Sequence, residues 1–169
     1  MNKSNIILIG MPGVGKSTVG VVLAKILGYH FVDTDLVIQE KEGRLLKDII
    51  EQEGNEGFIK IEEKINTELE AEYSVIAPGG SVIYGDKAMR HFKEIGTVVY
   101  LKASYEVINA RLSNLKGRGV VLKEGQTLKN LYDERCVLYE KYADITVDEG
   151  DRDLSDIAKD IAEHFFGKN

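Results

Sequence analysis

Short runs of apolar and β-branched residues alternate along the chain with longer segments in which apolar residues recur every three or four positions. Glycine, proline or charged residues bound each short run, as expected for strands that are buried on both faces of a sheet. The longer segments have the spacing of helices that bury one face. The predicted strands are Asn5–Ile9, His30–Asp33, Ser74–Ala77, Thr97–Leu101 and Ile145–Val147. The predicted helices are Lys16–Leu27, Leu36–Lys41, Leu45–Glu51, Glu56–Glu72, Asp86–Lys93, Tyr105–Ser113, Leu128–Tyr142 and Leu154–Phe166.

Strands that alternate with helices predict a parallel sheet covered on both faces, the three-layer α/β/α class. The chain has 169 residues and no repeat or linker, so we predict a single domain over residues 1–169. Ligands bind such sheets at the carboxyl ends of the strands. The most unusual residues of the chain follow its first three predicted strands, and we expect the functional site there.

Charge and cysteine content restrict the possible partners. The net charge is −6, from 22 basic and 28 acidic residues, which argues against a broad nucleic-acid or membrane surface. The single cysteine, Cys136, excludes an internal disulfide framework and fits a reducing compartment. The apolar run near the N-terminus is too short for a signal peptide. We therefore expect a cytoplasmic monomer that acts on small molecules.

A glycine-rich segment follows the first predicted strand. Gly10–Ser17 reads Gly-Met-Pro-Gly-Val-Gly-Lys-Ser and matches the phosphate-binding pattern G-x-x-x-x-G-K-[ST] in full. Glycines let the backbone N–H groups point at phosphate oxygens, and the following helix adds partial positive charge at its N-terminus. Lys16 is expected to reach the β- and γ-phosphates of ATP, and the Ser17 hydroxyl to ligate Mg²⁺. The expected ATP-binding residues of the loop are Gly13, Val14, Gly15, Lys16, Ser17 and Thr18.

Two carboxylates, Asp33 and Asp35, end the second predicted strand. In an extended segment residues two apart point the same way, so both are expected to face one cleft. Two acids beside a triphosphate repel it unless a cation lies between them, which favours Mg²⁺ with Asp33 as its outer ligand. Asp35 is then placed to accept a proton from an acceptor hydroxyl. The alternative interpretation is that one aspartate caps the helix Leu36–Lys41.

Together with other residues in the same order, these motifs resemble the shikimate kinase family, and the resemblance spans nearly the whole chain. It implies a P-loop kinase fold with strand order 2-3-1-4-5, a substrate-binding helical segment at about 34–72 and a lid at about 114–124. It also implies the reaction of ATP with shikimate to give ADP and shikimate 3-phosphate. The residues that carry the resemblance, besides the loop, are Asp33-Thr34-Asp35, Gly43-Arg44, Phe58, Glu62, Gly79-Gly80, Arg135 and Leu138-Tyr139.

The resemblance assigns roles to four arginines. Arg118 matches the lid arginine that stabilises the transferring phosphoryl group and joins Lys16 and Asp35 as an expected catalytic residue. Arg111 and Arg152 match adenine-side positions, although either is also compatible with an ordinary surface arginine. Arg135 matches the arginine that binds the substrate carboxylate; its alternative is a helix ion pair with Glu134 or Glu140. The expected acceptor-binding residues are Asp35, Ile59, Gly79, Gly80 and Arg135.

The chain departs from the family at three positions. Ile59 stands where the family has a second carboxylate-binding arginine, and Pro78 stands where it has a third glycine. In the lid, Gly119 follows Arg118 where a proline is usual. We predict an ATP-dependent small-molecule kinase with shikimate as the first acceptor to consider. The alternatives are a kinase of another small polyol or sugar acid, and an ATP-binding module without turnover.

Overall fold

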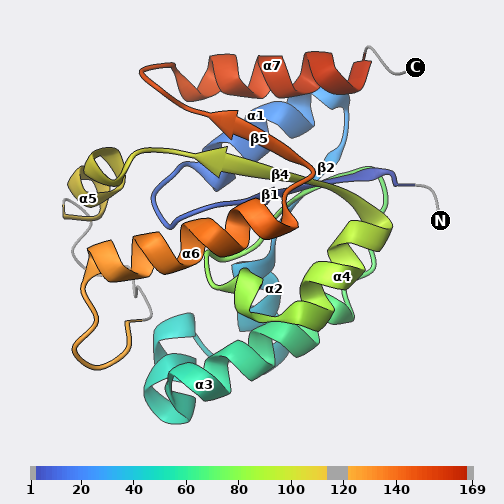
Figure 1. Cartoon of the computed structure of the whole chain (residues 1–169). Helices are drawn as coiled ribbons and strands as arrows, with labels where there is room; N and C mark the ends of the chain where they lie inside the picture. Colours follow the sequence, from blue (N-terminus) through green and yellow to red (C-terminus); the bar gives the residue numbers. More distant parts are fainter. Residues whose placement is uncertain (1–2, 114–121, 167–169) are drawn as a thin grey trace.

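The computed structural model describes residues 3–113 and 122–166, and its strands form one parallel sheet (Figure 1). The strand order β2-β3-β1-β4-β5 is the predicted one. Ile6 of β1 lies opposite Val75 on one side and Thr97 on the other. β1 is buried along its whole length because it has strands on both sides and helices on both faces. The strands are β1 (Asn5–Ile9), β2 (His30–Asp33), β3 (Ser74–Ala77), β4 (Gly96–Lys102) and β5 (Ile145–Asp148).

Helices cover the sheet on both faces, which confirms the predicted three-layer class (Figure 1). α1 and α7 pack against each other on one face, while α4 and α6 contact β4 from the other face. Within the described ranges, no helix is both long enough and apolar enough to cross a membrane. The helices are α1 (Lys16–Leu27), α2 (Thr34–Glu42), α3 (Leu46–Thr67), η1 (Val82–Tyr84, a 3₁₀ turn), α4 (Asp86–Ile95), α5 (Tyr105–Ser113), α6 (Leu128–Tyr142) and α7 (Leu154–Phe166).

The element α3 consists of two helices that meet at a kink. Leu45–Glu51 and Glu56–Glu72 were expected as two helices, and the structure has them on the two sides of Gly54, with the second ending at Thr67 instead of Glu72. Gly54 lies at the kink with φ of 70° and ψ of 177°, a backbone conformation that glycine adopts without steric cost. The chain thus changes direction at one residue and resumes the helix instead of forming a loop.

The segment formed by α2 and α3 has a small core of its own. Ile38 of α2 packs with Ile49, Phe58 and Ile65 of α3, apart from the main core around the sheet. This arrangement holds the α2–α3 segment in place beside the carboxyl end of β2 (Figure 1).

Candidate active site

A cavity of about 930 Å³ opens at the carboxyl ends of β1, β2 and β3, where the sequence predicts the site. The loop between β1 and α1 forms one wall, and the α2–α3 segment and the β3–η1 loop form the others. Polar side chains from distant parts of the chain face this one space, among them Lys16, Asp35, Arg111 and Arg135. A phosphate donor and a small acceptor therefore have room side by side.

Two glycines of the phosphate-binding loop are required by their surroundings. Gly10 has φ of 152°, and a Cβ atom there would lie 2.6 Å from the Leu101 carbonyl oxygen. Gly15 has φ of 101°, and its Cβ would lie 2.8 Å from Leu154 Cδ1. The loop is therefore packed closely between β4 and the start of α7, and side chains at these two positions would displace it.

Lys16 turns back over the loop that precedes it. Its Nζ donates to the carbonyl oxygens of Gly10 (2.8 Å) and Met11 (2.9 Å). Burial lowers the pKa of Lys16 to about 8, although the carboxylates of Asp35 and Asp33 act in the opposite direction. A phosphate beside Nζ would favour the charged ammonium form and supply an anionic partner for this half-buried group.

The two aspartates lie at the cavity, but not in the extended geometry that the spacing predicts. Asp33 ends β2 and caps α2: its Oδ1 accepts from the Asp35 backbone N–H at 3.0 Å. Thr34 and Asp35 already belong to α2, so the two side chains leave the backbone from a strand end and from a first helical turn. The capping interpretation is thus right for Asp33, while both carboxylates still line the cavity.

A buried glutamate behind the β3–η1 loop was not among the expected site residues. Glu62 of α3 is 1% exposed, and its Oε2 accepts from the Ser81 hydroxyl at 2.7 Å. A Cβ on Gly79 would lie 2.9 Å from Glu62 Oε1 and 3.0 Å from Asp35 Oδ1, so both carboxyl groups flank this glycine. Burial, and then the charge of Asp35, raises the pKa of Glu62 to about 7. Its position four residues after Phe58 and three before Ile65, on the apolar face of the helix, is the sequence signal that indicates a buried acid.

Arg135 lines the same cavity and is 2% exposed. Its guanidinium is 5.4 Å from the centre of the Tyr84 ring, and a Cβ on Gly80 would lie 3.1 Å from Nη1. The neighbouring glutamates have other partners: Glu134 accepts from the Tyr84 hydroxyl, and Glu140 pairs with Lys102. Over residues 3–113 and 122–166, Arg135 Nε has no hydrogen-bond partner. A buried guanidinium with unused donors is suited to a carboxylate.

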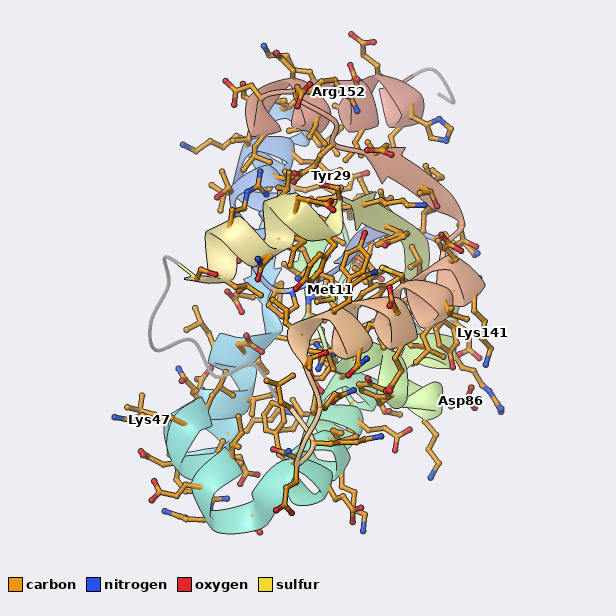
Figure 2. All side chains as sticks on the ribbon, turned by 60° about the vertical axis from the view of Figure 1, so that its left-hand side comes forward. Met11, Tyr29, Lys47, Asp86, Lys141 and Arg152 are labelled. Atoms are coloured by element: carbon orange, nitrogen blue, oxygen red, sulfur yellow. The ribbon has the colours of Figure 1, made fainter. Side chains whose placement is uncertain are left out.

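Some of the remaining expected residues line the cavity, some do not, and some lie outside the described residues. Arg111 lines the cavity, as do Gly79, Gly80, Pro78, Ser17 and Thr18. Arg152 and Ile59 do not line it. Arg152 pairs with Asp160 of α7 and donates to the Asp148 carbonyl; Figure 2 shows it beside α7, apart from Met11 of the loop. Ile59 is half-buried next to Phe58, which does line the cavity. Arg118 and residues 114–121 of the expected lid lie outside the described residues.

The oxygen ligands at the phosphate end fit Mg²⁺. The Ser17 side chain is exposed at the start of α1, and Asp33 lines the same cavity. Among the described residues, no three His, Cys, Asp or Glu side chains are grouped to hold a metal ion. Mg²⁺ commonly takes one or two protein oxygens and completes its shell with phosphate and water, so a hydroxyl and one carboxylate suffice.

Known proteins resemble the chain in sequence and in fold. The family model described as shikimate kinase matches residues 12–165. A shikimate kinase of Sulfurihydrogenibium sp. (strain YO3AOP1) is 37% identical over 158 residues, covering 93% of this chain and 95% of that protein. The solved structure of shikimate kinase from Acinetobacter baumannii in complex with shikimate has a TM-score of 0.89 and 33% identity, covering 99% and 96% of the two chains. That from Aquifex aeolicus has a TM-score of 0.76 and 31% identity, with 97% of each chain covered.

The sequence similarity thus extends from the phosphate-binding loop into α7, over the same elements that surround the cavity. Because the matches cover nearly the full length of this chain and of its relatives, the chain belongs to the shikimate kinase family.

Proposed function

We propose that the chain is a shikimate kinase, which transfers the γ-phosphate of ATP to a hydroxyl of shikimate and releases ADP. One observation carries the proposal: the phosphate-binding loop, Asp35 and the buried Arg135 line a single cavity. A donor phosphate and an acceptor that bears both a hydroxyl and a carboxylate suit this arrangement.

Each group has a role that follows from its chemistry. Lys16 leaves the carbonyls of Gly10 and Met11 and contacts the β- and γ-phosphates, which offer it a full negative charge. Ser17 and Asp33 would hold Mg²⁺, which would supply positive charge to neutralise the phosphates.

On the acceptor side, Asp35 accepts the proton of the attacking hydroxyl, and Arg135 binds the acceptor carboxylate through its planar fork of N–H donors. The sequence adds Arg118 as the group that stabilises the transferring phosphoryl charge.

A kinase of another small polyol or sugar acid is the second candidate, because of Ile59 and Pro78. Ile59 offers no cation to a carboxylate, and Pro78, which lines the cavity, offers no backbone N–H. Coupled ADP-release assays over a panel of cyclic polyols and sugar acids separate the candidates. We expect shikimate to give the largest kcat/KM. Shikimate turnover at the ATPase background, with turnover of another acceptor, would refute shikimate; no turnover with any acceptor would favour the ATP-binding module.

Two variants test the assigned roles. Lys16→Ala is expected to abolish transfer and weaken ATP binding, whereas Asp35→Asn abolishes transfer and leaves ATP binding largely intact. Glu40→Gln on the exposed face of α2 is the matched control and keeps full activity. Full activity in Asp35→Asn would exclude Asp35 as the base, and unchanged transfer in Arg118→Ala would exclude Arg118 from catalysis.

We further infer that the protein acts as a single-domain monomer in the cytoplasm, with residues 34–72 as the acceptor-binding segment. The single cysteine supports a reducing compartment such as the cytoplasm. Sedimentation at micromolar concentration is expected to give one species of monomer mass, and a dimer would overturn it.

A further inference from the structure

The outer side of the phosphate-binding loop contacts two segments that come much later in the chain. One is α5, which contributes Arg111, and the other is the turn between β5 and α7, which contributes Glu149. Figure 1 shows α5 and this turn at the same end of the sheet as the loop between β1 and α1. The contacts between these segments involve no residue to which the preceding section gives a catalytic role.

Glu149 has a fixed backbone and a buried side chain. Its N–H donates to the Lys102 carbonyl at 2.8 Å, and its own carbonyl accepts from the Arg152 N–H at 3.1 Å. Its side chain is 2% exposed. The carboxylate is therefore held at one place beside the end of β4, with little freedom to move.

Arg111 joins this carboxylate to the loop. Its Nη1 donates to the carbonyl oxygens of Gly13 and Val14, both at 3.1 Å. The same Nη1 lies 3.1 Å from Glu149 Oε2 and 3.4 Å from Oε1. One nitrogen atom thus links three segments that are distant in sequence.

The two partners contribute unequally to this arrangement. The Arg111 side chain is long and 36% exposed, so without a partner it has many conformations in solvent. Glu149 is short and buried, and burial raises the pKa of its carboxyl group while the attraction of Arg111 opposes that rise. Without the carboxylate, the Arg111 guanidinium can turn into solvent. The Glu149 carboxylate, in contrast, is buried and stays in place. Glu149 is accordingly the anchor of the pair.

The position of the two carbonyls affects the phosphate side of the loop. All described peptide bonds are trans, so the C=O and N–H of one peptide unit point in opposite directions. When Arg111 holds the Val14 carbonyl on the outside of the loop, the N–H of Gly15 is directed to the inside. A nest of inward N–H groups is what binds phosphate in loops of this kind.

We propose, on the basis of the kinase function above, that Glu149 is a positioning residue for the nucleotide. It holds Arg111 against the Gly13 and Val14 carbonyls, which keeps the loop in its phosphate-binding conformation and orients the guanidinium along the cavity wall. Glu149 contacts neither substrate itself. Its loss should weaken nucleotide binding and leave acceptor binding unchanged.

ADP binding without acceptor, measured by calorimetry, tests the proposal in the full chain. Glu149→Gln removes the charge and keeps the shape, and we expect ADP affinity to fall about tenfold, as for the loss of one hydrogen bond between charged groups. The KM for ATP should rise by a similar factor, with the KM for the acceptor unchanged. Asp144→Asn is the matched control: Asp144 precedes β5, pairs with Lys93 at 3.1 Å and contacts no residue of the loop. It should keep the affinity for ADP even if the melting temperature falls.

A double variant separates positioning from general stability. If Glu149 acts through Arg111, then Glu149→Gln combined with Arg111→Ala binds ADP no more weakly than Arg111→Ala alone. Independent, multiplicative losses would overturn the proposal, as would wild-type ADP affinity in Glu149→Gln. Should Glu149→Gln fail to fold, Arg111→Lys replaces it, since lysine keeps the charge but lacks the fork; wild-type ADP affinity in that variant also overturns the proposal.

The ADP-binding measurements use no acceptor, so they do not depend on which acceptor is the right one. Shikimate turnover together with unchanged ADP binding in the variants would overturn the role of Glu149 and leave the proposed function standing. If the variants bind ADP more weakly but the wild-type protein does not turn over shikimate, the role of Glu149 stands and the proposed function is overturned.

Discussion

The substitution Glu62→Gln should stabilise the protein at neutral and alkaline pH. Glu62 is buried in α3, with the Ser81 hydroxyl donating to Oε2 and, among the described residues, no hydrogen-bond partner at Oε1. Burial raises the pKa of Glu62 from its ordinary 4.5 to about 7; the bond from Ser81 opposes this rise and the charge of Asp35 adds to it. The folded protein thus keeps a proton on Glu62 that the unfolded chain releases near pH 4.5.

The sign and size of the effect follow from this difference in proton binding. Between about pH 4.5 and 7 the folded state binds more protons, so the free energy of unfolding falls as the pH rises through this range. The contribution of Glu62 is complete below pH 4.5 and lost above pH 7. A pKa moved from 4.5 to about 7 corresponds to roughly 3 kcal/mol at ~1.4 kcal/mol per pKa unit. Glutamine resembles the neutral acid at every pH and avoids this loss.

Urea unfolding at a series of pH values from 4.5 to 8 measures the effect. The two proteins should have similar stability at the acidic end, and Glu62→Gln should be more stable by up to roughly 3 kcal/mol at pH 8. Glu51→Gln, an exposed position on the same helix, is the control and should follow the wild-type curve. Parallel curves for wild type and Glu62→Gln, or a less stable Glu62→Gln at pH 8, would refute the reasoning.

Three further substitutions give defined outcomes. Ile59→Arg should lower the KM for shikimate about tenfold or more and leave the KM for ATP unchanged, because a charged hydrogen bond contributes roughly 1.5–3 kcal/mol. An unchanged KM for shikimate in initial-rate assays would mean that other residues bind the carboxylate. Tyr139→Phe removes the hydroxyl that donates to the Gly80 carbonyl at 2.6 Å, so thermal unfolding should show a loss of about 1–2 kcal/mol, and an unaltered melting temperature would contradict this. Gly20→Ala places a Cβ 2.6 Å from Phe31 Cε2 and should cost about 1–3 kcal/mol in urea unfolding; an unchanged free energy of unfolding would contradict this.

The elements with strong local signals could be predicted from the sequence. β1, β2 and β3 have the predicted bounds because each is a short, largely apolar run that ends at a glycine, proline or charged residue. The phosphate-binding loop was equally clear, since its pattern lies between a strand and a helix. At Gly54 the local signal was ambiguous: the same glycine permits a loop or a kink, and the packing of Ile49 and Phe58 with Ile38 favours the kink.

The residues that were missed depend on tertiary contacts. Glu149 lies between Val147 and Gly150 in a stretch that is typical of an exposed turn, yet its side chain is buried and pairs with Arg111 of α5. Arg152, two residues after Gly150, pairs with Asp160 on α7, which the sequence did not indicate; its adenine-side role stays a prediction. Spacing along the chain cannot distinguish these outcomes, because both depend on how α5 and α7 pack.

Because Gly15 packs against Leu154, the phosphate-binding loop can bind nucleotide only after the ribosome has made α7. The ribosome makes the phosphate-binding loop well before Glu149, Leu154 and the rest of α7. β1, at the centre of the sheet, must likewise wait for β3 and β4 on its two sides. Nucleotide therefore cannot act as an early folding template for a nascent chain, and ribosome-bound fragments that lack α7 should bind no ADP.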